Sequence, residues 1–150
     1  MRISEEGINF IIRHEGLELE PYEDVAGKWT VGVGHLLRDG EERRTITTEE
    51  SRELLRKDLA CAELAVNKMV KVPVTQKEYD SLVSLTFNIG KQAFFTSSVL
   101  RFLNEQNYDD AAEAFLLWNK ITKDGKKVMS QGLLNRRRAE MTLFLGGDYA

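Results

Sequence analysis

The chain contains only one cysteine, Cys61, so it can form no internal disulfide and implies no oxidising compartment. It also has only two prolines and no Ser/Gly tract or repeated block, which excludes a collagen-like, linker-dominated or disordered chain. The longest uncharged apolar stretch near the start covers residues 7–12, far below the ~20 residues of a membrane span. We therefore expect a soluble protein with no membrane anchor and no export signal. Its 150 residues suffice for one domain with a real core.

Histidine is equally scarce, with only His14 and His35. Neither has a second His, a Cys or a suitably spaced carboxylate that would complete a metal site. We therefore expect neither a metal ion nor another cofactor. His35 is expected to be a structural side chain that hydrogen-bonds a carboxylate, and Cys61 is expected to pack in the long helix that contains it.

Positive charge is not in excess, because the net charge is -3 at pH 7. This balance argues against a general nucleic-acid binder. The charge is unevenly distributed: residues 1–60 hold 9 Lys/Arg and 14 Asp/Glu, whereas residues 61–150 hold 12 and 10. Between residues 120 and 138 the basic side chains are opposed only by Asp124. A polyanionic partner therefore stays open at that end of the chain.

The first part of the chain predicts a helix followed by a small sheet. Ser4 is a cap residue, apolar residues follow at helical spacing up to Ile12, and Gly16 ends the helix. From residue 22 to residue 35, apolar and polar or glycine residues alternate around a turn, which is typical of a β-hairpin. We expect a third short strand before residue 47.

Beyond residue 47 only helices are predicted. Thr47 with Glu50 forms a capping box and opens a long helix that ends before Pro73. A second capping box at Thr75 opens an apolar helix that stops at Gly90 and is expected to be buried at the centre. Shorter helices are expected over residues 98–104, 109–120 and 132–145, with a polar loop at 122–127.

These elements predict an α+β fold that is mainly helical. We expect a single domain over 1–150 with two lobes: a β-containing lobe over about 12–47, and a helical lobe over about 70–150 that includes the amino-terminal helix. The helix over about 48–70 connects them. A groove between the lobes is the expected ligand site.

Glu15 is the first candidate catalytic residue. It continues the apolar face of its helix and lies at the helix's carboxyl end. Desolvation and the negative ends of the nearby carbonyl dipoles both disfavour an ionised carboxyl there. A carboxylic acid that stays protonated near neutral pH is a general acid. The alternative is a glutamate that turns to solvent or pairs with an arginine.

Asp24 and Thr30 lie on the hairpin that follows Glu15. If the polar face of the hairpin folds back over the helix end, both come within reach of Glu15. Glycoside hydrolysis needs one protonated carboxyl for the leaving oxygen and one carboxylate that activates water or stabilises positive charge, and a hydroxyl can hold the water. Taken alone, an aspartate in the position of Asp24 is more often a turn residue that hydrogen-bonds its own backbone, and a threonine in the position of Thr30 is more often a strand former.

The same stretch resembles a known family. Residues 14–16 (HEG), 21–22 (PY), Asp24, Gly27 and 29–35 (WTVGVGH) are similar to the active-site stretch of the phage-type lysozymes, the endolysin muramidases of glycoside hydrolase family 24. The likeness continues in order along the whole chain, through residues 45–47, 79–82, 87–90, 111–112, Phe115, Trp118, 132–133, 135–138 and Glu140.

The resemblance implies roles for these residues. Glu15 matches the general acid, Asp24 the second carboxylate, and Thr30 the hydroxyl that orients the attacking water. The implied substrate is the β-1,4 bond from N-acetylmuramic acid to N-acetylglucosamine in peptidoglycan. Inversion is expected, which requires carboxyl groups roughly 6.5–9.5 Å apart.

Two further positions are expected to bind near the substrate. Arg136 looks like the helical arginine that lies against the catalytic glutamate in the family, with Arg137 one residue away as the alternative. Asn88 is the candidate for a neutral polar contact to the sugar, or else a helix cap. Phe115 and Trp118 are either cleft residues or core residues.

The resemblance also predicts partners and location. Peptidoglycan is the expected partner and no nucleic acid is expected. The protein is predicted to be a monomer that accumulates in the host cytoplasm until a holin releases it to the cell wall. Two other functions stay open: a lytic transglycosylase that cleaves the same bond without water, and a non-catalytic helical module that binds through the basic segment.

Overall fold

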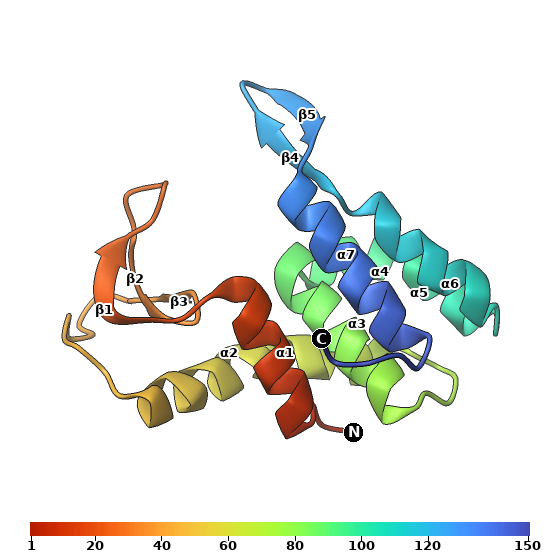
Figure 1. The fold of residues 1–150 in the computed structure, drawn as a ribbon, viewed down its shortest axis with the longest axis horizontal. Helices are drawn as coiled ribbons and strands as arrows, with labels where there is room; N and C mark the ends of the chain where they lie inside the picture. The colour runs from red at the N-terminus through yellow and green to blue at the C-terminus, as the bar shows by residue number, and fades with distance from the viewer.

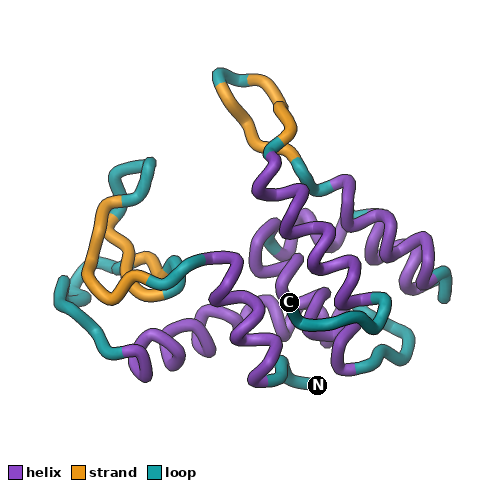
Figure 2. The backbone as a smooth tube through the Cα atoms, viewed as in Figure 1, coloured by secondary structure: helices purple, strands orange, loops and turns teal.

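The computed structural model describes residues 1–150 and shows seven α-helices with two small antiparallel sheets. This is the α+β, mainly helical fold that the sequence predicts. The strands of the first sheet lie at one end of the molecule and most helices gather at the other (Figure 2). No helix is both long enough and apolar enough to cross a membrane.

The amino-terminal part contains the predicted helix and sheet. Its elements are α1 (Glu5–Glu15), β1 (Glu18–Glu23), β2 (Trp29–Gly32) and β3 (His35–Leu36), and the strand order is β1-β2-β3. The hydroxyl of Ser4 accepts the N–H of Gly7 at 3.0 Å, as expected of a helix cap. Strand β3 is the third short strand that was expected before residue 47, so that prediction is confirmed.

The long helix α2 (Thr48–Met69) runs from the first sheet to the helical part (Figure 1). Its capping box forms as predicted: Thr47 Oγ1 accepts the Glu50 N–H at 3.0 Å, and the Glu50 carboxylate accepts the Thr47 N–H at 3.1 Å. Cys61 of α2 is exposed, so the expectation that it packs inside was wrong. Its position beside the apolar stripe did not place it on the buried side.

Helix α3 (Gln76–Ile89) is the buried central helix that its composition predicts. Every residue from Tyr79 to Thr86 is buried. Its apolar side chains join one cluster of 22 buried residues with Phe10 of α1, Leu59 of α2 and Phe144 near the carboxyl end. Four of the eight buried positions on α3 are nevertheless polar: Asp80, Ser81, Ser84 and Thr86.

The remaining helices follow the prediction in part. They are α4 (Lys91–Thr96), α5 (Ser98–Asn104), α6 (Tyr108–Ala114) and α7 (Gln131–Phe144). Helix α4 was not predicted. The helix expected over 109–120 ends at Ala114 and tightens into a 3₁₀ turn, η1 (Phe115–Leu117), after which the chain leaves helical geometry.

The polar loop expected at 122–127 is instead a β-hairpin. Strands β4 (Lys120–Lys123) and β5 (Lys126–Met129) pair antiparallel, with Asp124 and Gly125 as the two turn residues. Both turn residues have positive φ, 52° and 76°, as a two-residue hairpin turn requires. All eight strand residues are exposed, so no buried face produced the alternation that reveals a strand. The hairpin projects from the body next to the start of α7 (Figure 1).

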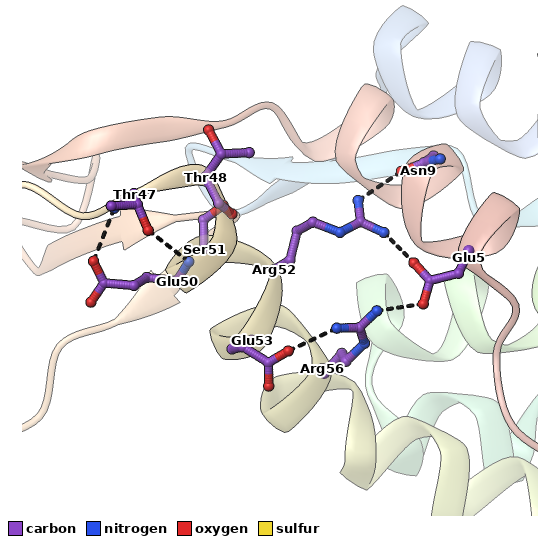
Figure 3. Close-up of polar contacts among 9 residues, drawn as sticks. All are labelled: Glu5, Asn9, Thr47, Thr48, Glu50, Ser51, Arg52, Glu53 and Arg56. Carbon is purple, nitrogen blue, oxygen red and sulfur yellow. Dashed lines mark hydrogen bonds and ion pairs between the residues drawn. The ribbon is translucent and has the colours of Figure 1, made fainter.

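Hydrogen bonds and ion pairs join α1 to α2 (Figure 3). Arg52 donates to Asn9 Oδ1 at 2.7 Å and also to the carboxylate of Glu5, which Arg56 contacts as well. Apolar side chains of α1 anchor its other face in the buried cluster. The helix that ends at Glu15 is therefore fixed on two sides.

Candidate active site

Glu15 is the last residue of α1. The helix ends there because Gly16 has φ 83° and ψ 163°, a conformation that glycine adopts far more readily than other residues. The Glu15 side chain is 26% exposed, and its Oε2 lies 3.2 Å from Nη1 of Arg136. Desolvation of the Glu15 carboxyl is therefore smaller than expected. The alternative that the sequence left open, an ion pair between Glu15 and an arginine, is formed. Arg136, not Arg137, makes this contact.

Asp24 lies at the entrance to the turn between β1 and β2. Its Oδ1 accepts the N–H groups of Ala26 and Lys28, both at 2.9 Å. The backbone closes the same turn, with the Asp24 N–H donating to Lys28 O at 2.8 Å and Gly27 at φ 77°. The turn role of Asp24 is thus real, but it occupies one carboxylate oxygen. Oδ2 makes no hydrogen bond and remains available for chemistry.

Thr30 lies on β2, where it pairs with Tyr22 of β1 and Leu36 of β3. It is only 3% exposed. Its Oγ1 donates to Lys28 O at 3.2 Å, which leaves the oxygen lone pairs free to accept a hydrogen bond from water. The hydroxyl is therefore held by the same turn that holds Asp24.

No hydrogen bond joins Glu15 directly to Asp24 or Thr30. Each group is positioned by its own element: Glu15 by the end of α1 and Arg136, Asp24 by the turn, and Thr30 by β2. Only two residues separate the end of α1 from the start of β1. The arrangement supplies a carboxyl, a carboxylate oxygen and a hydroxyl as separate groups.

A cavity of ≈ 760 Å³ lies beside the first sheet. Its lining includes Trp29 of β2, Asp58 of α2 and Phe87 of α3, so that sheet, connecting helix and central helix all contribute. Residues 27–29 carry the lining into the turn that holds Asp24, although Glu15, Asp24 and Thr30 are not themselves part of it. Arg43 covers the Trp29 ring at 4.3 Å from its centroid.

The remaining candidates from the sequence, Asn88, Phe115 and Trp118, differ in their exposure to solvent. Asn88 is exposed near the end of α3, next to the cavity residue Phe87, and its side chain makes no hydrogen bond. It does not cap the helix, which ends on Gly90. Phe115 is fully buried against Phe144, and Trp118 packs against the same core. Phe115 is therefore a core residue, and Trp118 is a partly buried residue that packs against the core.

His35 bonds two carboxylates, one more than the sequence suggested. Nδ1 lies 2.9 Å from Asp58 Oδ2 and Nε2 lies 3.1 Å from Glu41 Oε2. Partial burial of the ring opposes protonation, but the bonds to Glu41 and Asp58 outweigh it and raise the pKa of His35 above 6.5. The imidazole thus joins β3 to α2 and to the loop after β3.

Sequence reasoning missed a buried polar group behind Glu15. Arg137 and Glu140 of α7 are both fully buried and pair with each other, and Ser84 of α3 bonds Glu140. Glu140 was noted only as part of the family resemblance. The i, i+3 and i, i+4 spacing of Arg136, Arg137 and Glu140 could have indicated a shared helix face.

Comparison with known proteins places this geometry in context. The family model described as phage lysozyme matches residues 12–140. The endolysin of Salmonella phage P22 is 50% identical over 149 residues, covering 97% of this chain and 99% of that protein. The solved endolysin from Escherichia coli O157:H7 phage FAHEc1 has a TM-score of 0.91 at 45% identity, covering 97% of this chain and 94% of that one. The muramidase domain of SpmX from Asticaccaulis excentricus has a TM-score of 0.89 at 38% identity, covering 96% and 97%.

Proposed function

The chain belongs to the phage lysozyme family and is an endolysin-type lysozyme that hydrolyses peptidoglycan, and we propose that Glu15, Asp24 and Thr30 carry out the reaction. The bond cleaved is the β-1,4 linkage from N-acetylmuramic acid to N-acetylglucosamine. The observation that carries the assignment is the placement of Glu15 at the end of α1, paired with Arg136 and followed at once by the hairpin that bears Asp24 and Thr30.

Glu15 acts as the general acid. Its side chain is partly open to solvent, so a substrate oxygen can approach it, and protonation of that oxygen lets the glycosidic bond break. Arg136 fixes the direction of the carboxyl. The second oxygen of Glu15, Oε1, has no bonding partner and is the one free to deliver the proton.

Asp24 and Thr30 act on the water and on the developing positive charge. Because Oδ1 of Asp24 accepts the two turn N–H groups, Oδ2 has no competing donor and is the oxygen that we assign to the reaction. The Thr30 hydroxyl donates to Lys28 O and accepts from the attacking water. A water held on the opposite side of the sugar ring from the acid gives inversion at the anomeric carbon.

The substrate lies in the groove between the sheet-bearing lobe and the helical lobe. The cavity beside β2 and Phe87 provides room for a neighbouring sugar, and Asn88, the residue after Phe87, is the candidate that bonds an acetamido or hydroxyl group. We expect the enzyme to act as a monomer. We further propose that it accumulates in the host cytoplasm and needs a holin to reach the wall.

The test is the loss of the acid. Glu15→Gln should abolish the clearing of a suspension of permeabilised cells while leaving the thermal unfolding midpoint near that of the native protein. Full lytic activity in this variant would overturn the assignment. Co-expression with and without a pore-forming holin tests the release step, since lysis is expected only when the holin is present.

A lytic transglycosylase is the alternative for the same bond. That reaction forms a 1,6-anhydro sugar and uses no water, so it has no need of a hydroxyl that orients one. The products differ by one water, and mass spectrometry of the released muropeptides separates them. Hydrated products are expected.

A further inference from the structure

Three charged side chains of α7 are buried against α3. Arg136 is 5% exposed, and Arg137 and Glu140 are 0% exposed. Removal of an ion from water costs several kcal/mol, and apolar side chains at such positions are often equally or more stabilising. Stability alone therefore does not explain why this sequence places three charges behind Glu15.

All three nitrogens of the Arg136 guanidinium contact oxygen atoms of other residues. Nε lies 3.2 Å from Glu140 Oε2, and Nη2 donates to both the carbonyl and the hydroxyl oxygen of Ser84 at 3.3 Å. Ser84 Oγ in turn donates to Glu140 Oε2 at 2.5 Å. Only Nη1 is directed out of this group, and it contacts Glu15 at 3.2 Å.

Glu140 also contacts the second arginine. Its Oε1 lies 2.7 Å from Nε of Arg137, and its Oε2 accepts from Arg137 Nη2 at 3.2 Å. Burial raises the pKa of Glu140, although the two arginines and the hydrogen bond from Ser84 act to lower it. Burial also lowers the pKa of Arg137. One carboxylate thus offsets part of the charge of two buried cations.

We propose that Glu140 is a positioning residue for the lysozyme reaction: it aims Arg136 at Glu15 and limits the positive charge that the two arginines exert on Glu15. The inference rests on the proposed role of Glu15 as the general acid. An uncompensated cation favours the ionised form of a nearby carboxyl, which has no proton to donate. Glu140 therefore extends the activity of the enzyme toward higher pH.

The other charged groups around this site come from α1 and from α7. On α1, Arg13 is exposed and His14 precedes Glu15 directly. Burial, followed by the positive charges of Arg136, Arg13 and Arg137, lowers the pKa of His14 below 6.5. Helix α3 contributes the neutral Ser84, and Arg138 of α7 is exposed. Glu140 is the one buried anion of the group.

The first test is Glu140→Gln, which keeps the size of the side chain and removes its charge. We expect kcat on peptidoglycan to fall with little change in KM, and the alkaline limb of the pH–activity profile to move to lower pH by roughly 1 unit. Arg138→Gln is the matched control on the same helix, and its profile should equal the native one. A native alkaline limb in folded Glu140→Gln overturns the proposal.

A second variant separates charge from packing. Arg137→Gln combined with Glu140→Gln removes one charge of each sign, so the alkaline limb should return toward its native position even though two buried residues are changed. An equal displacement in the single and double variants overturns the proposal. If Glu140→Gln does not fold, Glu140→Asp takes its place: it keeps the charge but withdraws the carboxylate from Arg136. For Glu140→Asp we expect a lower kcat with an unmoved limb, and a native kcat overturns the positioning role.

Glu15→Gln is measured alongside so that two kinds of failure are distinguished. If Glu15→Gln remains active, the assignment of the acid fails and the role of Glu140 fails with it. If Glu15→Gln is inactive while Glu140→Gln keeps the native profile, only the role of Glu140 is overturned.

Discussion

Nη1 of Arg136 lies 3.2 Å from Oε2 of Glu15, and this ion pair joins α7 to the end of α1. The next arginine, Arg137, points into the protein and pairs with Glu140 instead. Two neighbouring residues of one helix therefore have different tasks. Arg136 contacts both Glu15 and the buried Glu140, whereas Arg137 contacts only Glu140 of these two carboxylates.

This difference predicts the stability of the arginine variants. Arg137→Ala leaves Glu140 fully buried with one partner fewer, so we expect the free energy of unfolding to fall by about 3–5 kcal/mol. Arg138→Ala changes an exposed side chain and should alter it by less than about 0.5 kcal/mol. Urea unfolding at pH 7 measures both. Equal losses in the two variants would contradict the assignment of Arg137 as the buried partner.

Asp24 combines a turn role with a proposed catalytic role, and two substitutions separate them. In Asp24→Asn the side-chain oxygen can still accept from Ala26 and Lys28, so the turn should persist while kcat falls by about 10²–10⁴-fold. Asp24→Ala should lose the same activity and also about 1 kcal/mol of stability, because two backbone donors lose their acceptor. Initial rates of wall lysis and thermal unfolding test this. Native activity in Asp24→Asn would remove Asp24 from the mechanism.

The Thr30 hydroxyl is tested by a change that keeps the shape of the side chain. Thr30→Val replaces only the hydroxyl, and we expect a loss of kcat of about 10²-fold with the fold retained. Thr30→Ser keeps the hydroxyl and should retain most of the activity. Nuclear magnetic resonance of the first-formed anomer adds a second measurement, since the native enzyme should release the inverted product. Comparable kcat values for the Val and native proteins would argue against water positioning by Thr30.

The comparison of sequence with structure shows which signals are informative. Two capping boxes located the starts of α2 and α3, because a cap pairs two residues at a fixed spacing. The β4–β5 hairpin was missed because periodicity reports burial, and this hairpin has no buried face. Its only signal was the Asp124-Gly125 pair, which is typical of a two-residue hairpin turn.

The candidate site shows the same difference between local sequence signals, which are informative, and contacts between distant residues, which are harder to predict. Glu15, Asp24 and Thr30 could be proposed because their residue types and spacing match a reaction and a family. The partners that hold them could be foreseen less well, since they come from distant parts of the chain. The contact of Arg136 with Glu15 was expected only from family resemblance. The bonds from Ser84 to Glu140 and from Asp58 to His35 depend on how helices pack, which local pattern does not report.

His35 predicts a pH dependence of stability that is independent of catalysis. Because its pKa is raised in the folded protein, the folded state binds the proton more tightly than the unfolded state does. The stabilisation is complete below the unfolded pKa of about 6.5 and is lost as the pH rises through the folded value. His35→Asn should therefore lower the free energy of unfolding more at pH 5.5 than at pH 9, with a difference on the order of 1 kcal/mol.

The partner variant provides the control for this effect. Asp58→Asn removes the carboxylate 2.9 Å from Nδ1 but leaves the imidazole and Glu41 in place, so the raised pKa of His35 should fall part of the way toward 6.5. The free energy of unfolding that Asp58→Asn loses relative to the native protein should likewise be larger at pH 5.5 than at pH 9. The difference between the two pH values should be smaller for Asp58→Asn than for His35→Asn. Urea unfolding of the three proteins at both pH values measures the effect. A pH-independent loss in both variants would mean that His35 contributes by packing rather than by its charge.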